Sequence, residues 1–239
     1  MHYSEYTDLE ADDRTIACHP IIDACNASIA YRLLEQLGFG SGPHVVLDLG
    51  SGTGQMSRFL RGLPSVVVES LDIDPEAERH YREHPELADI QFHRLDFLSD
   101  DLPRIYDAII VRGVYHHIPK SRRPYVLKKL SDCAQTFIVA DEGIREYRSE
   151  SERVENCVSW YTYVIREAHR RGLPELARIE SRYLEHESAA SADDGGDFKE
   201  SPSHLLADAK SVGLEPRHLD RFGPWEKAGG GFFTTTFVK

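Results

Sequence analysis

The stretch VVLDLGSGTG at residues 45–54 decides the fold of this chain. It begins within an apolar run from His44 to Leu49 that has the length of a buried β-strand, and a helix is expected from about Gln55 to Leu63. The glycines between them let the backbone turn tightly and let a ligand approach it closely. The start of the helix adds backbone N–H donors and a partial positive charge. The stretch therefore predicts an α/β unit with a ligand site at its turn.

The alternation of strands and helices continues along the chain. Helices are expected at 21–37, from residue 75 and at 119–130, and strand-like runs lie at 44–49, 65–73, 90–95, 106–111, 136–141, 214–222 and 231–239. Apolar runs separated by helices are typical of parallel strands buried on both faces, whereas the last two runs, with no helix between them, indicate an antiparallel hairpin. The expected fold class is α/β, a doubly wound, seven-stranded, mostly parallel sheet with an antiparallel C-terminal hairpin.

The pattern becomes purely helical after the fifth strand. Apolar residues recur at helical spacing from about Ser149 to Gly172, and a second helix is expected from Pro174 to about Glu187. Residues 191–197 are polar and glycine-rich, which favours a loop, and Ser201-Pro202 predicts the start of a helix that ends at Val212. No linker is long enough to divide the chain. Residues 1–239 are therefore expected to form one domain, with an inserted helical hairpin at 145–200.

Composition excludes several classes of protein. The chain has 28 Lys plus Arg against 40 Asp plus Glu, so its net charge is 28 − 40 = −12. This acidity argues against nucleic-acid binding, which needs clustered cations. No apolar run approaches the ~18 residues of a membrane span, and the acidic N-terminus lacks the apolar core of a signal peptide. The four scattered cysteines indicate reduced thiols. A cytoplasmic protein that does not bind membranes is expected, either a monomer or a homodimer.

Two interpretations of the glycine turn compete. Nicotinamide enzymes favour G-x-G-x-x-G, in which the cofactor pyrophosphate lies on the helix end. Here the spacing is G-x-G-x-G, formed by Gly50, Gly52 and Gly54, and Asp48 precedes the first glycine by two residues. A negative charge at that point suits a ligand with a cationic amino group better than a diphosphate.

Further motifs follow the next three strands in order. An acidic segment, LDIDP, ends the second strand at 71–75; HRLDF follows the third at 93–97; YDAIIVRGVYHHIP covers the fourth strand and the turn after it at 106–119. With these motifs, the sequence from about Ile21 to the C-terminus resembles the class I S-adenosylmethionine-dependent methyltransferases, of the type that act on small molecules. The resemblance implies a Rossmann-like fold, S-adenosylmethionine as cofactor and S-adenosylhomocysteine as product. The terminal hairpin also resembles the reversed last strand of that family.

The resemblance carries over a set of cofactor-binding residues. Asp72 would hold the ribose hydroxyls, and it follows Gly50 by 22 residues, in line with the ~20 expected for a ribose-binding acid. Ile73 would pack on the adenine, Asp96 would accept a hydrogen bond from its amino group, and Phe97 would flank the ring. The set is completed by Asp48, Gly50, Ser51, Gly52, Thr53, Gly54 and Arg112.

The fourth motif supplies the catalytic candidates, because its strand end would face the transferred methyl group. His116 and His117 are candidate bases, since histidine titrates near neutral pH, although a histidine here often has a packing role in the family. Tyr115 is a candidate substrate contact. Arg112 could pair with a carboxylate or phosphate of the substrate, or form an ion pair with Asp141 or Glu142 at the end of the fifth strand. No Asp-Asn pair follows that strand, so no metal is expected.

The helical hairpin and the N-terminus are the expected covers of the site. Insertions at this place commonly cover the acceptor pocket in the family, so 145–200 is interpreted as a lid, and residues 1–20 as a cap over the cofactor. The aromatic residues of the hairpin suit a small organic acceptor, although simple helix packing explains them as well. The expected function is methyl transfer to an O, N or C nucleophile of a small molecule, such as a specialised metabolite. Alternatives are an RNA or protein acceptor, or an inactive methyltransferase-like binding protein.

Overall fold

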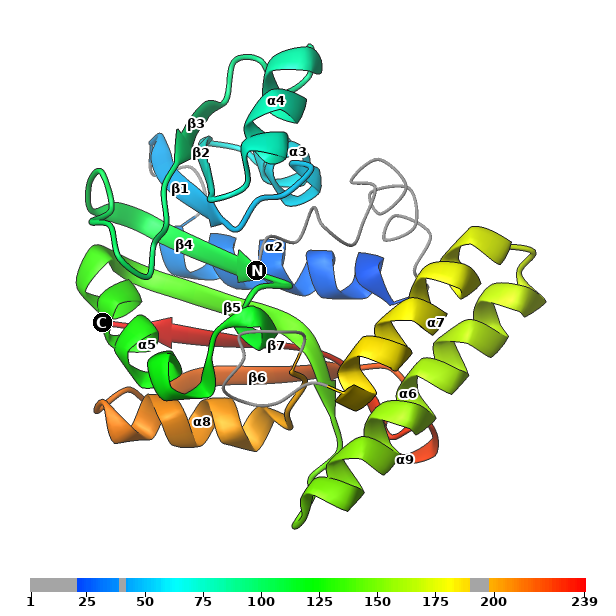
Figure 1. The fold of residues 1–239 in the computed structure, drawn as a ribbon. Coiled ribbons are helices and arrows are strands. Elements are labelled where there is room, and N and C mark those ends of the chain that lie inside the picture. The colour runs from blue at the N-terminus through cyan, green and yellow to red at the C-terminus, as the bar shows by residue number, and fades with distance from the viewer. Residues whose placement is uncertain (1–20, 39–41, 190–197) are drawn as a thin grey trace.

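The computed structural model describes residues 21–38, 42–189 and 198–239. These residues form an α/β structure around one central sheet (Figure 1). The expected cap at 1–20 and the polar loop at 191–197 lie outside the described residues.

The sheet contains seven strands in the order β3-β2-β1-β4-β5-β7-β6 among the described residues. They are β1 (His44–Leu49), β2 (Val66–Asp72), β3 (Gln91–Arg94), β4 (Tyr106–Arg112), β5 (Ala134–Ile144), β6 (Pro216–Phe222) and β7 (Gly230–Val238). The first five strands are parallel, whereas β7 is antiparallel to both β5 and β6. This order confirms the doubly wound sheet and the antiparallel C-terminal hairpin.

Helices cover both faces of the sheet (Figure 1). They are α2 (Ile22–Leu37), α3 (Gln55–Arg61), α4 (Pro75–Glu83), α5 (Arg123–Cys133), α6 (Glu150–Arg170), α7 (Pro174–Ala189), α8 (Pro202–Ser211) and α9 (Trp225–Ala228), with 3-10 turns η2 (Tyr115–His117) and η3 (Lys120–Arg122). Successive residues of β1 point to opposite faces of the sheet. Val46 packs into one apolar cluster and Leu47 into the other, and neither is exposed, so both faces are covered.

Local sequence signals account for several helix starts. The Asp74 side chain accepts a hydrogen bond from the backbone N–H of Glu76 at 2.8 Å and caps α4, whose first residue is Pro75. Ser149 caps α6 in the same way. Ser201 occupies the position before α8, but its side chain donates to Glu146 rather than capping the helix.

Two elements differ from the expectation. The fifth strand extends over Ala134–Ile144 because it pairs with β7 along its length, from Thr136 opposite Val238 to Ile144 opposite Gly230. The connection within the terminal hairpin, in which no helix was expected, contains the short helix α9. The extension of β5 carries the chain beyond the carboxyl end of the parallel strands before α6 begins.

The helices α6 and α7 form the expected hairpin after β5 (Figure 1). Trp160 of α6 is fully buried, lies edge-on to Phe232 of β7 at 6.3 Å between ring centroids and stacks with Tyr163. These aromatic side chains therefore attach the hairpin to the sheet. No helix among the described residues combines the length and apolarity needed to span a membrane.

Candidate active site

The glycine turn joins β1 to α3 at the carboxyl end of the central strands. Gly50, Gly52 and Gly54 have φ values of 72°, 49° and 74°, a region that favours glycine. A Cβ at Gly50 would lie 2.3 Å from Cγ2 of Val114, so the turn is packed closely against the segment after β4. A Cβ at Gly52 would meet no atom of the described residues within 4 Å. The turn is therefore closely packed at Gly50, whereas the described residues leave the backbone at Gly52 accessible to a ligand.

Asp72, the last residue of β2, is hydrogen-bonded to this turn. One carboxylate oxygen accepts from the Gly52 N–H at 2.8 Å, and the other from the Asp74 N–H at 2.9 Å. Burial raises the pKa of Asp72, although the backbone donors of Asp74 and Gly52 oppose this effect. The next residue, Ile73, is an apolar side chain with 48% exposure. The expected ribose-binding acid thus lies against the glycine turn, beside an exposed apolar surface.

Asp48 lies beneath the turn, and its carboxylate faces a polar network. It is 1% exposed and accepts from the Ser57 hydroxyl at 2.5 Å, and Ser57 is hydrogen-bonded to Ser70 and Tyr81. Burial raises the pKa of Asp48 to about 6, while Ser57 and Arg112 act in the opposite direction. Asp48 thus joins β1 to α3, β2 and α4 and holds a titratable charge under the turn. Ser51 and Thr53 of the turn are also buried.

The third segment forms a tight turn after β3. The Asp96 carboxylate accepts from the Leu98 N–H at 2.9 Å and from the Ser99 hydroxyl at 3.1 Å. Phe97 is partly buried and packs against the apolar cluster beneath α5 and α8. The structure thus gives both residues local partners, and their expected contacts with adenine remain predictions.

Arg112 ends β4 next to the glycine turn. Its guanidinium donates to Oδ1 of Asn26 in α2 at 3.2 Å and to Oε1 of Gln55, the first residue of α3, at 3.0 Å. These contacts place a cation beside the N-terminus of α3, where anionic groups are favoured. The sequence missed both amide partners, because no local pattern links residues 26, 55 and 112.

The turn after β4 separates the three other candidates. The Tyr115 hydroxyl donates to Asp208 of α8 at 2.6 Å and is buried, so this group joins two helical elements. The His116 ring instead contacts Asp141 of β5, with 2.5 Å between Nδ1 and Oδ1, and the His116 backbone N–H donates to Oδ2 at 3.0 Å. The His117 ring lies 4.0 Å from that of His116.

Asp141 determines which nitrogen of His116 can take a proton. Burial would raise the pKa of this 2%-exposed carboxyl, but its interactions with His116 outweigh burial and lower the pKa. An ionised carboxylate only accepts hydrogen bonds, so Nδ1 must donate and Nε2 carries the lone pair of the neutral ring. The geometry is that of a histidine oriented to accept a proton at Nε2.

The two acids at the end of β5 have different partners. Asp141 holds His116, and Glu142 lies 3.2 Å from Nζ of Lys199. From the sequence, both acids were candidate ion-pair partners of Arg112. The hydrogen bonds of Arg112 described above go to the side-chain amides of Asn26 and Gln55. Within the described ranges, no group of three His, Cys, Asp or Glu side chains is arranged to hold a metal ion.

Comparisons with known proteins agree with this geometry. Residues 46–136 match the family model of a methyltransferase domain, a span that contains the glycine turn, Asp72, Asp96 and the turn after β4. Over this span, which is less than half of the chain, the sequence is therefore similar to a methyltransferase domain. No curated protein sequence matches the chain significantly.

Solved structures of several methyltransferases share the fold of this chain. A cyclopropane synthase from Mycobacterium tuberculosis has a TM-score of 0.60 at 13% identity, over 89% of this chain and 84% of its own. A magnesium protoporphyrin IX methyltransferase from Synechocystis PCC 6803 with bound S-adenosylhomocysteine has a TM-score of 0.57 at 13% identity, over 100% and 88%. A putative sarcosine dimethylglycine methyltransferase from Galdieria sulphuraria has a TM-score of 0.57 at 16% identity, over 89% of this chain and 86% of its own. At these identities the likeness establishes the fold alone.

The residues at this site fit S-adenosylmethionine. No described atom blocks approach to the Gly52 backbone, Asp72 offers carboxylate oxygens beside it, and the exposed Ile73 offers an apolar surface. Arg112 and the N-terminus of α3 provide positive charge for a carboxylate. These features would hold the ribose, the adenine and the amino-acid part of the cofactor respectively.

Proposed function

We propose that this chain is a methyltransferase, which transfers the methyl group of S-adenosylmethionine to an O, N or C nucleophile of a small-molecule acceptor. The observation that carries the proposal is the oriented His116–Asp141 pair, which joins the turn after β4 to the neighbouring strand β5. The cofactor supplies an electrophilic methyl group, and the acceptor must supply a nucleophile held close to it. His116 would take the proton that a protonated nucleophile loses, and Asp141 would stabilise the resulting imidazolium.

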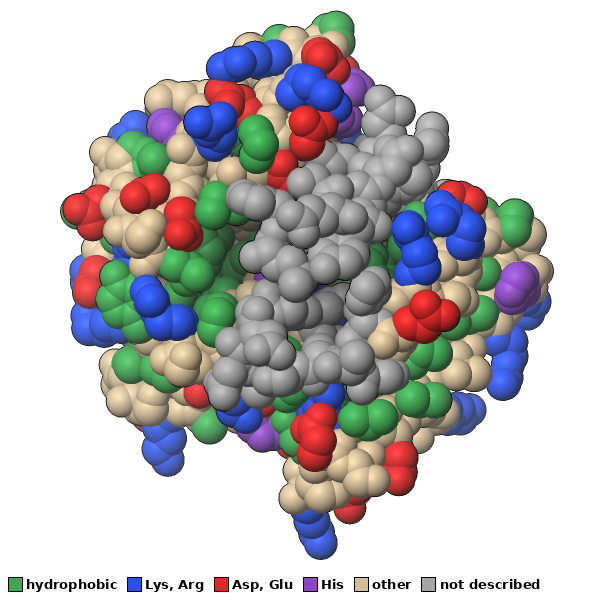
Figure 2. Space-filling model, in the orientation of Figure 1, with side chains coloured by type: hydrophobic (Ala, Val, Ile, Leu, Met, Phe, Trp, Pro, Cys, Tyr) green, Lys and Arg blue, Asp and Glu red, His purple; other side chains and the backbone are tan. Residues whose placement is uncertain are grey.

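Surface charge supports a small acceptor over RNA. The net charge is −12, and on the face in Figure 2 the described Lys and Arg side chains are interspersed with Asp and Glu. Binding to an RNA backbone depends on clustered cations, so this distribution disfavours it. The similar structures include enzymes named for magnesium protoporphyrin IX and for sarcosine dimethylglycine, which are small molecules.

The hairpin of α6 and α7 is proposed to cover the acceptor. It is the next element after β5, the strand that carries Asp141 and Glu142. Lys199, which follows the hairpin in the sequence, returns to Glu142 and to Tyr161 of α6. A cover anchored in this way would exclude water from the reacting groups.

Binding and product release test the proposal separately. Calorimetry should detect binding of S-adenosylmethionine and of S-adenosylhomocysteine. A screen of phenols, alcohols, amines, carboxylic acids and carbon nucleophiles should then identify a compound that makes release of S-adenosylhomocysteine depend on enzyme and acceptor. Bulk RNA and protein serve as competing acceptors in parallel reactions. Transfer to RNA or protein alone would contradict the small-molecule assignment, and absence of cofactor binding would contradict the site.

A further inference from the structure

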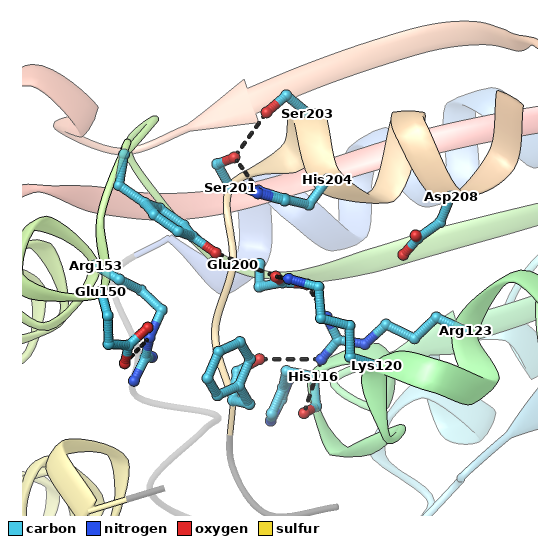
Figure 3. Close-up of polar contacts among 12 residues, drawn as sticks. His116, Lys120, Arg123, Glu150, Arg153, Glu200, Ser201, Ser203, His204 and Asp208 are labelled. Atoms are coloured by element: carbon cyan, nitrogen blue, oxygen red, sulfur yellow. Dashed lines mark hydrogen bonds and ion pairs between the residues drawn. The ribbon is translucent and has the colours of Figure 1, made fainter. Parts of the chain in front are cut away.

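Three consecutive buried residues, Phe198, Lys199 and Glu200, come just before α8, and Figure 3 shows Glu200 among its polar contacts. We call them the strap. Their exposures are 5%, 2% and 7%, although two of the three are charged. Charged side chains are rarely buried unless they are paired, so the partners of the strap indicate what it does.

The strap is bonded to the turn that carries His116. The Phe198 N–H donates to the His116 carbonyl at 3.2 Å, and the Ile144 N–H at the end of β5 donates to the Glu200 carbonyl at 3.2 Å. The strap backbone therefore lies between the segment after β4 and the end of β5. It contacts the backbone of His116, whereas Asp141 contacts its ring and its N–H.

Arg123, the first residue of α5, connects the same two segments with its side chain. It has no exposed surface, and its guanidinium donates to the carbonyls of Ile118 at 2.9 Å, Phe198 at 3.2 Å and His116 at 3.4 Å. It also forms an ion pair with Glu200. One planar side chain thus fixes the carbonyls of His116 and Ile118 in the turn and the carbonyl of Phe198 in the strap.

Glu200 completes this arrangement with three donors. Besides Arg123, its carboxylate accepts from Lys120 Nζ at 2.8 Å and from the Tyr147 hydroxyl at 3.1 Å. Burial alone would raise the pKa of Glu200, but the charges of Arg123 and Lys120 outweigh it and lower the pKa. The carboxylate is therefore ionised at neutral pH. It accepts charge-assisted hydrogen bonds from both Arg123 and Lys120.

The other two strap residues contact α6. Lys199 Nζ lies 2.5 Å from the Tyr161 hydroxyl, and the Phe198 ring lies 4.1 Å from the Arg153 guanidinium. Arg153 and Tyr161 are both fully buried. The strap therefore links the first helix of the hairpin to the turn that carries His116.

We propose that the strap, locked by the Arg123–Glu200 pair, positions His116 for proton transfer. The proposal rests on the proposed function of His116 as the base. A buried ion pair adds little net stability, because the loss of hydration offsets its attraction, whereas its directed hydrogen bonds fix geometry. Fixing geometry is what a base needs, since a displacement of ~1 Å at a reacting group costs on the order of 10²-fold in rate. Arg123, Phe198 and Glu200 are positioning residues in this scheme.

Two substitutions test the lock, and one serves as the matched control. Glu200→Gln keeps the size of the side chain but removes its charge, and Arg123→Lys keeps the charge but removes the planar fork that reaches three carbonyls. Asp132→Asn removes an exposed acid whose partner is Lys128 on the same helix, α5. All three are compared with the full-length wild-type chain bound to S-adenosylhomocysteine, at a temperature at which each is folded.

Amide hydrogen exchange gives a readout that needs no acceptor. In Glu200→Gln and Arg123→Lys, the amides of Phe198 and His116 should exchange at least about tenfold faster, while the amide of Val46 in β1 keeps its wild-type rate. The control should change neither. Equal acceleration of all three amides would mean general destabilisation and would overturn the positioning role, as would unchanged exchange at Phe198 and His116.

Kinetics with the acceptor found in the screen give the second readout. Both lock variants should lower kcat by roughly 10- to 100-fold and leave KM for S-adenosylmethionine within about twofold, because the cofactor residues are untouched. An unchanged kcat would overturn the proposal. Should Glu200→Gln not fold, Lys120→Gln weakens the same carboxylate from its half-exposed side, and wild-type exchange together with wild-type kcat in that variant would overturn it. A wild-type chain that methylates no small molecule contradicts the proposed function instead, and the exchange experiment still decides whether the strap holds His116.

Discussion

Asp48→Asn should change how the stability of the protein depends on pH. Burial raises the pKa of Asp48 to about 6 in the folded chain, against an ordinary value of ~3.9. The folded state therefore binds this proton more tightly than the unfolded state, and the wild-type chain loses that stabilisation as pH rises from ~4 through 6. At ~1.36 kcal/mol for each pKa unit, the loss is about 3 kcal/mol. Asparagine does not titrate, so the variant does not undergo this loss.

The difference in free energy of unfolding, variant minus wild type, should rise by about 2 kcal/mol between pH 4 and pH 7, since part of the total change falls outside this range. Urea denaturation of the cofactor-free proteins, followed by circular dichroism, measures it at each pH. Other titrating groups affect both proteins alike and cancel in the difference. The Asp132→Asn variant, measured in the same way, controls for the loss of a surface carboxyl. A difference for Asp48→Asn that stays constant with pH would refute the assignment of a raised pKa to this buried carboxyl.

The same carboxyl links pH to the cofactor. If the ionised Asp48 favours the positive charges of S-adenosylmethionine, binding at pH 6 should release protons from wild type but not from Asp48→Asn. Calorimetry in buffers of different ionisation enthalpy measures this release. Equal proton release in the two proteins would show that the charge of Asp48 is not coupled to the ligand.

Three further substitutions test separate parts of the structure. Asp72→Ala should weaken binding of S-adenosylmethionine by about 100-fold in calorimetry, since hydrogen bonds to a charged group contribute ~1.5–3 kcal/mol, and an unchanged affinity would contradict the ribose assignment. His116→Gln should lower kcat by ~10²- to 10⁴-fold and remove the limb of the pH–rate profile at low pH, with cofactor affinity as the unchanged control. Asp220→Asn breaks the hydrogen bonds from Arg32 that join β6 to α2 and should lower the free energy of unfolding by about 1–2 kcal/mol at pH 7. The pKa of Asp220 is lowered, chiefly by the hydrogen bond from Arg32, so that loss should fade as pH falls below ~4, and a loss that persists there would exclude the charge as its cause.

The fold was predictable because its signals are local. Apolar runs of strand length, helical spacing between them and the cap formed by Asp74 and Pro75 each specify one element without knowledge of the others. Parallel order then follows from the alternation of elements. The extra length of β5 was not predictable in this way. Its last residues are added by pairing with β7, about 90 residues later in the chain, and Glu142 and Gly143 do not form an apolar run.

The cofactor side of the site was predictable for a related reason. Glycines with positive φ and an acid at the end of the next strand appear in the sequence as a short, ordered pattern. The environment of these residues was not. Asp48 faces Ser57 and Tyr81, and Arg112 faces Asn26, because side chains from α2, α3 and α4 meet only when the helices pack on the sheet. Those partners determine the pKa of Asp48 and the orientation of Arg112.

The acceptor side was the least predictable part, and the strap shows why. A run of Lys199, Glu200 and Ser201 next to a glycine-rich stretch has the composition of a solvated loop, yet all three residues are buried. Their burial depends on Arg123, Tyr161 and Glu142, which lie in three different elements. A charged residue can be buried only when its partners are already in place, so no single segment of the sequence could reveal the strap.

The end of β5 explains how one strand serves both halves of the acceptor side. Successive side chains of a strand point to opposite faces, so Asp141 and Glu142 are directed to different partners. Asp141 forms an ion pair with His116 in the turn after β4, and Glu142 forms one with Lys199 in the strap. The strap returns to the His116 carbonyl through Phe198, which closes a loop of contacts around the histidine. A displacement of the α6–α7 hairpin would therefore move Lys199 against Glu142 and Phe198 against His116 together, so the position of the proposed base depends on whether the proposed cover is seated.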